Sequence, residues 1–296
     1  MEKIKKIDIH AHASFLTEYA PTFAPTSTDK WPSPELVIDF YDKLGVEFGI
    51  LQPLVSPERF RVTITNEDVY CCVNKYPDRF RWFCNVDPRA VSFGPKANLG
   101  YVLEHYMKMG AIGCGEVTSS LYMDDPMVEN LFGYCSELGL PVTIHIAPQY
   151  MTYYGLIDDV GLPRLEKILQ KFPKLKLLGH SQCFWREIGD NTDSYYPKGP
   201  VKNGKLAHLL SKYENLYGDL SGDSGSNALM RDREHAAKFI EEFSDKLMYA
   251  CDICKASNTF PFEFNDFLDS MRESGEISES NYRKLVRENA IRILNL

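Results

Sequence analysis

Two histidines close to the start of the chain have the spacing of a metal-binding pair. Residues 8–12 read DIHAH, at the end of an apolar run that begins at Ile4. Such a run predicts a buried strand, and side chains two residues apart in a strand point to the same face. His10 and His12 would then point at one place, with Asp8 one pleat below. Because neutral imidazole nitrogen binds zinc and related ions, the pair supplies half of a metal site.

The rest of the chain alternates predicted strands with predicted helices. We expect strands at residues 4–9, 48–53, 80–86, 111–117, 141–146, 175–179, 216–219 and 247–250. Helices are expected at 34–44, 66–76 (with Asn66 as its N-cap), 101–109, 126–138, 162–172, 205–213 and 234–243, and a mostly helical tail at 261–296. This alternation is typical of parallel βα units. Eight such units predict one (β/α)8 TIM-barrel domain over residues 1–296. An open doubly wound sheet would favour a glycine-rich phosphate turn, which the sequence lacks.

The ends of the predicted strands carry the ionisable residues. Active sites of (β/α)8 barrels lie at the carboxyl ends of the strands. Six candidate metal ligands stand there: His10, His12, Glu116, His145, His180 and Asp252. The other three of the seven histidines fall within predicted helices. Because buried ionisable groups need partners, this gathering predicts a metal centre rather than core packing.

The composition excludes some other functions. Hydrophobic residues make up 44% and charged residues 25% of the chain, as in an ordinary globular protein, and the net charge is −8 without a basic stripe. We therefore expect no nucleic-acid partner. We also expect no membrane span, because no apolar run approaches about 18 residues. The first residues lack the apolar core of a signal peptide, which favours a cytoplasmic location.

The eight cysteines are best interpreted as reduced thiols. Most lie in apolar segments, and without an export signal disulfides are not expected. Cys251 and Cys254 form a C-x-x-C pair around Asp252. A zinc ribbon would need a second pair, and a thioredoxin-like role would need a different βαβ context.

The combined motifs resemble the amidohydrolase superfamily, and most closely its amidohydrolase-related branch, which includes aminocarboxymuconate-semialdehyde decarboxylase-like enzymes. The matching stretches are DIHAH (8–12), NKYPDRFRWFCNVDP (74–88), SELGLPVTIHIAP (136–148), FPKLKLLGHS (172–181), NLYGDLSG (215–222), KLMYACDI (246–253) and ENAIRILNL (288–296). They cover nearly the whole chain in the family's order. The resemblance is specific for the superfamily but not for a substrate.

The resemblance implies a role for each strand-end residue. His10 and His12 resemble the family's H-x-H metal pair, and His145 and His180 its histidines of strands five and six. Asp252 resembles the strand-eight aspartate, which binds metal, accepts a proton from water, or does both. Glu116 departs from many decarboxylase-like relatives and resembles the bridging ligand of two-metal members. Its alternative role is to support a ligand histidine.

Three functions follow as hypotheses. The first is hydrolysis of a C–N, ester or lactone bond of a small molecule, because a bound metal lowers the pKa of water to about 7. Asp252 would take the proton and His180 would bind a second metal or polarise the substrate. The second is non-oxidative decarboxylation of a small carboxylic acid, in which Asp252 or His180 handles the proton. The third is a catalytically silent binding homologue.

Further contacts and cofactors are expected around this site. Arg59, next to Arg61, could bind an anionic substrate, and Trp185 and Arg186 could form one wall of the pocket or a subunit contact. We expect Asp219 to brace His180. The cofactor is one or two divalent ions per chain, zinc first and manganese or iron as alternatives. The family resemblance favours a homodimer or a larger homo-oligomer.

Overall fold

The computed structural model describes residues 4–16, 30–58, 63–92, 94–149 and 154–296. Its principal strands are parallel and buried: β1 (Lys6–Ala11), β2 (Val46–Leu51), β3 (Phe80–Trp82), β4 (Cys114–Val117), β5 (Val142–Ala147), β7 (Leu177–His180), β8 (Leu216–Asp219) and β9 (Leu247–Met248). All six residues of β1 and of β5 are buried, as expected where helices cover a parallel sheet. These strands confirm the eight predicted ones.

The strands form two ladders whose edges meet. One ladder has the order β1-β2-β3 and the other β4-β5-β7-β8-β9. The Cys84 N–H donates to Gly113 O at 3.0 Å beside β3 and β4, and the His12 N–H donates to Ile253 O at 3.1 Å beside β1 and β9. The strand order around these contacts is that of a (β/α)8 barrel.

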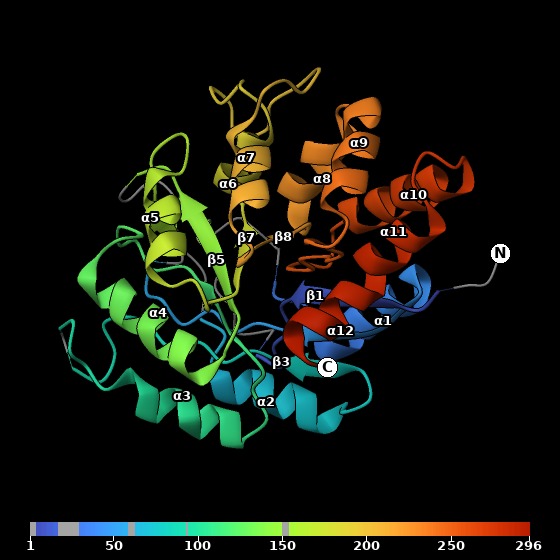
Figure 1. Ribbon diagram of the computed structural model, residues 1–296. Helices are drawn as coiled ribbons and strands as arrows, with labels where there is room; N and C mark the ends of the chain where they lie inside the picture. The colour runs from blue at the N-terminus through green and yellow to red at the C-terminus, as the bar shows by residue number, and fades with distance from the viewer. Residues whose placement is uncertain (1–3, 17–29, 59–62, 93, 150–153) are drawn as a thin grey trace.

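Helices surround the strands (Figure 1). The longer ones are α1 (Pro34–Leu44), α2 (Asn66–Lys75), α3 (Leu99–Lys108), α4 (Pro126–Leu138), α5 (Pro163–Lys171), α7 (Lys205–Lys212), α8 (Gly222–Met230), α9 (Arg233–Phe243) and α10 (Phe260–Glu273). The last segment continues through α11 (Glu279–Arg283), a π-helical turn (Lys284–Glu288) and α12 (Asn289–Leu294). Within the described residues, no helix combines the length and apolar character needed to cross a bilayer.

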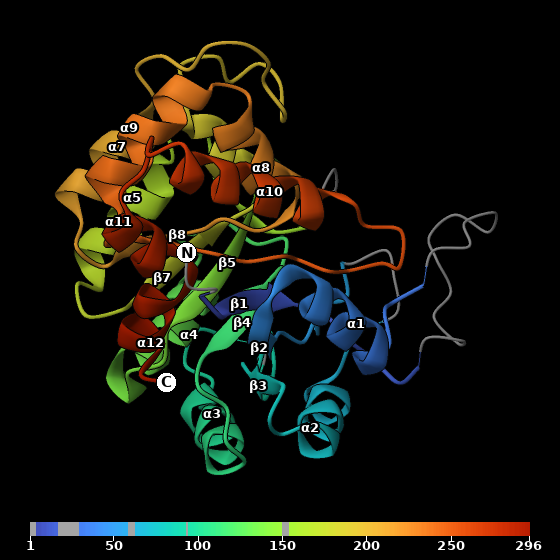
Figure 2. The same ribbon diagram turned by 90° about the vertical axis from the view of Figure 1, so that its right-hand side faces the viewer.

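The two ends of the fold are packed together. Figure 2 shows the C-terminal helices beside the first strand. The buried Lys6 ammonium of β1 donates to Asn265 of α10 at 2.5 Å and to Asp269 at 3.1 Å. Arg287 donates to the backbone oxygen of Lys5 at 3.0 Å. These bonds hold the strand that carries the two N-terminal histidines against the end of the chain.

The structure also contains elements that the sequence pattern did not predict. The stretch 181–204 begins with a short helix, α6 (Gln182–Trp185), and a 3-10 turn (Arg186–Ile188). A two-residue strand, β6 (Leu156–Ile157), pairs with β5. Helix α8 follows β8 in a segment whose glycines and serines weaken any helical pattern.

The prediction that Asn66 caps α2 is wrong. The cap is Thr65, whose hydroxyl accepts from the Asp68 N–H at 3.1 Å. The Asn66 side chain instead pairs with the backbone of Asn85, accepting from its N–H at 2.7 Å and donating to its oxygen at 2.8 Å. The Asn66 side chain is therefore engaged in a long-range interaction with Asn85 and does not cap the helix.

Candidate metal centre

Five of the six predicted ligands point into one buried volume at the carboxyl ends of the strands. His10 and His12 come from β1 and its end, Glu116 from β4, His180 from the end of β7, and Asp252 from the segment after β9. The four side chains other than Asp252 are at most 4% exposed, whereas the Asp252 side chain is 21% exposed. Residues that are distant in the sequence therefore lie close together at this end of the strands.

The ligand atoms around His10 Nε2 and His12 Nε2 are spaced as ligands of an ion would be. His12 Nε2 lies 3.2 Å from His10 Nε2, 3.4 Å from Asp252 Oδ1 and 3.5 Å from Glu116 Oε2. His10 Nε2 lies 3.7 Å from Glu116 Oε2 and 4.0 Å from Asp252 Oδ1. Ligands about 2.0–2.2 Å from a tetrahedral ion are separated by about 3.3–3.6 Å. The residues present therefore fit a divalent ion.

Two groups of potential ligands overlap at one nitrogen. Within the described part of the chain, His10 belongs both to a group with His12 and Asp252 and to a group with Glu116 and His180. The other ring nitrogen of His10 faces Asp219, so His10 has one lone pair to offer. The two groups consequently describe alternatives around one centre.

Hydrogen bonds at Nδ1 fix the orientation of the two N-terminal ligand histidines. His10 Nδ1 donates to Asp219 Oδ2 at 2.7 Å, and His12 Nδ1 donates to the backbone oxygen of Gln52 at 2.9 Å. Because a carboxylate and a carbonyl only accept, each Nδ1 carries the proton and each Nε2 keeps its lone pair for an ion. The prediction that Asp219 braces His180 is wrong, since its partner is His10. Gln52 was not predicted, because it acts on His12 through a backbone oxygen that every residue carries.

His145 forms a hydrogen bond with Glu116 instead of joining the group of ligand atoms. Its Nδ1 donates to Glu116 Oε1 at 2.5 Å, and its ring lies 4.5 Å from the ring of Tyr154. Asn85 Nδ2 donates to the backbone oxygen of Glu116 at 2.6 Å. Both ends of the Glu116 residue are therefore held in place. A direct ligand role for His145 stays a prediction, because its nitrogen is in neither of the groups described above.

Burial and neighbouring charges shift the pKa values of the candidate ligands. Burial disfavours a charged His10, but the carboxylates of Asp219, Glu116 and Asp252 together outweigh burial and raise the pKa of His10 well above its usual value. Burial likewise favours a protonated Asp252, but a hydrogen bond from His12 and the charge of His10 outweigh it and hold the pKa of Asp252 at about 2. Burial and the charge of His10 lower the pKa of His180 to about 4. Ionised Asp252 and neutral His180 are in the forms that bind metal, whereas an ion that binds His10 must displace a proton from it.

Asp8 links the two strands that carry ligands. Its Oδ1 accepts from the backbone N–H groups of His10 at 2.9 Å and Cys251 at 2.8 Å, and its Oδ2 accepts from the Tyr41 hydroxyl at 2.8 Å. Burial raises the pKa of Asp8 to about 7. The Asp8 carboxylate therefore positions β1 against the segment that presents Asp252.

Of the residues predicted to contact a substrate, the structure describes Trp185 and Arg186 but not Arg59. Arg59 and Arg61 lie outside the described residues. Trp185 is buried, and its indole N–H donates to the backbone oxygen of Asp219 at 2.8 Å. Arg186 is also buried, with its guanidinium 5.6 Å from the ring of Tyr195. Contact of these side chains with a substrate stays a prediction.

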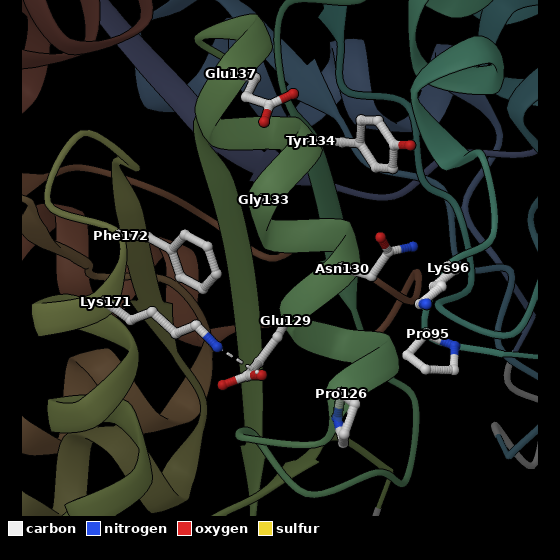
Figure 3. A pocket seen from close by; sticks show the side chains of 10 residues that line it. All are labelled: Pro95, Lys96, Pro126, Glu129, Asn130, Gly133, Tyr134, Glu137, Lys171 and Phe172. Carbon is white, nitrogen blue, oxygen red and sulfur yellow. Dashed lines mark ion pairs between the residues drawn. The ribbon is translucent and has the colours of Figure 1, made fainter.

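A surface groove lies elsewhere on the molecule. It has a volume of about 540 Å³ and runs along α4 (Figure 3), where Lys171 and Glu129 form an ion pair at 2.8 Å across its wall. None of the candidate metal ligands lines this groove. It therefore contributes nothing to the centre.

Known proteins share this architecture. An uncharacterised TIM-barrel protein from Bordetella bronchiseptica is 18% identical, with 99% of each chain covered and a TM-score of 0.64. A probable 2-pyrone-4,6-dicarboxylic acid hydrolase from Acinetobacter baumannii is 13% identical, with 99% of this chain and 100% of that chain covered and a TM-score of 0.60. A dihydroxybenzoic acid decarboxylase from Polaromonas, solved with manganese and 2-nitroresorcinol, is 18% identical, with 99% and 97% covered and a TM-score of 0.56.

Further decarboxylase structures resemble the chain as well, and these likenesses establish the fold. None of the curated proteins matches the sequence. A family model described as Amidohydrolase matches residues 7–296, nearly the whole chain. Together with the strand-end ligands, this match means that the chain belongs to the amidohydrolase family.

Proposed function

We propose that the protein is a divalent-metal-dependent decarboxylase that removes CO2, without oxidation, from a small hydroxylated aromatic carboxylic acid. The observation that carries this proposal is the spacing of ligand atoms around His10 Nε2, where either His12 and Asp252 or Glu116 and His180 could complete a site for one ion. The substrate class comes from the decarboxylases that resemble the chain, which act on dihydroxybenzoate and 5-carboxyvanillate.

The roles of the residues follow from their geometry. When bound, the ion supplies positive charge that attracts an anionic substrate. His10, His12 and Glu116 are nearly inaccessible to water, which strengthens electrostatic interactions within the site. Asp252 Oδ1 faces the ligand cluster while Oδ2 lies 4.0 Å from His180 Nε2. The second oxygen is therefore available to carry a proton.

The proposed reaction balances without an oxidant. The bond between the substrate carbon and its carboxylate breaks, CO2 leaves, and the electron pair remains on the carbon. Asp252, which is ionised at rest, takes a proton from a phenolic hydroxyl of the substrate and passes it from Oδ2 to that carbon, and the hydroxyl regains a proton from solvent. Asp252 suits this role because its side chain is more exposed than those of the ligand histidines. His180 Nε2 lies where it could contact an oxygen of the substrate.

Isotope labelling tests this reaction. Protein loaded with manganese or zinc, with its metal content measured, would be incubated without oxygen in ²H2O with a panel of hydroxybenzoic acids. We expect CO2 release and one deuterium at the vacated carbon. His180→Asn should lower kcat by about 10²–10⁴-fold, whereas His208→Asn, which changes an exposed histidine of α7, should not. Absence of CO2 across the panel would overturn the proposal.

Hydrolysis is the second candidate. It is favoured by the two carboxylates, Glu116 and Asp252, that lie beside His12 Nε2, because either could take a proton from an attacking water. The resemblance to a probable 2-pyrone-4,6-dicarboxylic acid hydrolase also supports it. Lactones and esters tested in H2¹⁸O would give a product carboxylate that contains ¹⁸O if hydrolysis is the activity.

A further inference from the structure

Three buried cysteines meet beside the junction of the two ladders. Cys84 follows β3, Cys114 begins β4 and Cys135 lies on α4, and all three side chains are fully buried. The Cys114 thiol forms hydrogen bonds with the thiols of Cys84 and Cys135. All three are free thiols. They form a cluster of nucleophilic groups that the proposed reaction does not use.

Cys84 and Cys114 lie directly opposite each other across this junction. The Cys84 N–H donates to Gly113 O at 3.0 Å, and the Gly115 N–H donates to Cys84 O at 2.8 Å. This is the hydrogen-bond pattern of a parallel pair. Because the two side chains also contact each other and pack in the same core as Cys135, they lie on one face of the strands.

The spacing of this pair permits a disulfide but does not favour a relaxed one. Neighbouring strands lie about 4.7–4.9 Å apart. Disulfides join residues whose Cα atoms are about 4.4–6.8 Å apart, and most often about 5.5–6 Å. A disulfide between Cys84 and Cys114 would therefore push the two strands apart, and strained disulfides are readily reduced. Such a bond suits a reversible modification better than a permanent cross-link.

The same junction holds Glu116 in place. Asn85, directly after Cys84, donates to the backbone oxygen of Glu116 at 2.6 Å. Gly115, directly before Glu116, donates to Cys84 O at 2.8 Å. Both hydrogen bonds cross the junction beside the two thiols. A change in strand separation there must therefore move the glutamate relative to the other candidate ligands.

We propose that Cys84 and Cys114 form a reversible oxidation site, where a hydroperoxide converts the two thiols to a disulfide that weakens metal binding. In the first step the sulfur of one thiol attacks hydrogen peroxide, the O–O bond breaks, and a sulfenic acid and water form. In the second step the other thiol attacks the sulfenic sulfur, the S–S bond forms and a second water leaves. Overall, the two thiols lose two electrons and two protons, and the peroxide is reduced to two waters.

Burial of the two thiols sets the expected rate. The peroxide reaches them only through local opening of the fold, so their oxidation should be slower than that of Cys71, which is exposed. Cys71→Ser removes the faster reaction and is included in every protein tested.

A peptide map tests the site. The zinc-loaded protein would be treated with hydrogen peroxide and then catalase, its free thiols alkylated, and the chain digested for mass spectrometry. We expect a cross-linked peptide that joins Cys84 to Cys114 and the loss of two titratable thiols, both reversed by dithiothreitol. A disulfide that joins other cysteines instead, such as Cys114 to Cys135 or Cys251 to Cys254, would overturn the proposal. Absence of any disulfide after prolonged exposure would overturn it as well.

Zinc affinity tests the coupling to the centre. Competition with a chelator should show about 10- to 100-fold weaker zinc binding after oxidation, and dithiothreitol should restore the original affinity without the need for a variant. Cys84→Ser should keep its affinity under peroxide, whereas Cys183→Ser, which changes another buried thiol, should lose affinity as the parent protein does. A cross-link that leaves zinc affinity unchanged would refute the coupling. These measurements need no substrate, so failure to find decarboxylation would refute the proposed function and leave them standing.

Discussion

At the scale of single residues, the groups behind the ligands determine what the ligands can do. Asp219 and the backbone oxygen of Gln52 leave the Nε2 lone pairs of His10 and His12 for an ion. Glu116 is held by His145 in the same way. Metal affinity should therefore depend on residues that never touch the ion.

Asp219→Asn tests this dependence. The amide keeps the size of the side chain but removes the charge and the acceptor-only character that place the proton of His10 on Nδ1. We expect metal affinity to fall by about 10- to 100-fold, measured by competition with a chelator. Asp39→Asn, which changes an exposed carboxylate of α1, is the control. Equal affinities for the two variants would contradict the prediction.

Gly222 provides a second prediction at this scale. It has a φ of +73°, and an added Cβ would lie 3.0 Å from Asp252 Oδ2 and 3.6 Å from His180 Cε1. Gly222→Ala should destabilise the fold by about 1–2 kcal/mol through the backbone and should also weaken metal binding by displacing Asp252.

Gly139 is a matched control for the backbone effect. Its φ is +71°, and nothing lies within 4 Å of an added Cβ. Gly139→Ala should show the same loss of stability in denaturant unfolding but no change in metal affinity. If both variants keep the wild-type affinity, contact between position 222 and Asp252 does not matter for the centre.

At the scale of elements, helix ends and strand ends are coupled through side-chain amides. Asn66 at the start of α2 is bonded to the backbone of Asn85, and Asn85 Nδ2 donates to the backbone oxygens of Pro53 and of Glu116. These bonds join the segments that follow β2 and β3 to β4. The first turn of α2 therefore supports the strand that presents the glutamate.

Two substitutions at neighbouring positions separate local capping from this long-range support. Thr65→Ala should cost about 1 kcal/mol of unfolding free energy, because it removes the cap of α2. Asn66→Ala should cost about 2–3 kcal/mol, because it leaves the buried N–H and C=O of Asn85 without their partner, and it should also weaken metal binding. Urea unfolding and a chelator titration measure the two effects. A larger stability loss for Thr65→Ala would show that capping dominates.

At the scale of the whole molecule, the centre joins parts of the chain that are far apart in sequence. Its candidate ligands come from β1, β4, the end of β7 and the segment after β9. An unfolded chain holds no such arrangement, so an ion that binds these residues binds only the folded state. Metal binding and global stability must then be linked.

Metal removal tests this linkage. Zinc at about 100 times its Kd should raise the unfolding free energy by about 2.7 kcal/mol over the chelated protein, measured by urea denaturation at fixed pH. His10→Ala should be insensitive to zinc over the same range, because it lacks the nitrogen common to both ligand groups. Equal stability of wild type with and without zinc would argue against a centre formed only on folding.

The sequence by itself determined the alternation of elements and the strand ends on which the ligands stand. Apolar runs, proline and glycine act through neighbouring residues, so their pattern predicts local structure directly. The tertiary structure decided the hydrogen-bond partners. Asp219 bonds to His10, 209 positions away in the sequence, Asn66 bonds to the backbone of Asn85, and the Trp185 indole donates to the backbone oxygen of Asp219. Such pairings depend on how the strands lie beside one another and on side-chain orientation, and no local pattern encodes them because the partners become neighbours only when the whole fold has formed.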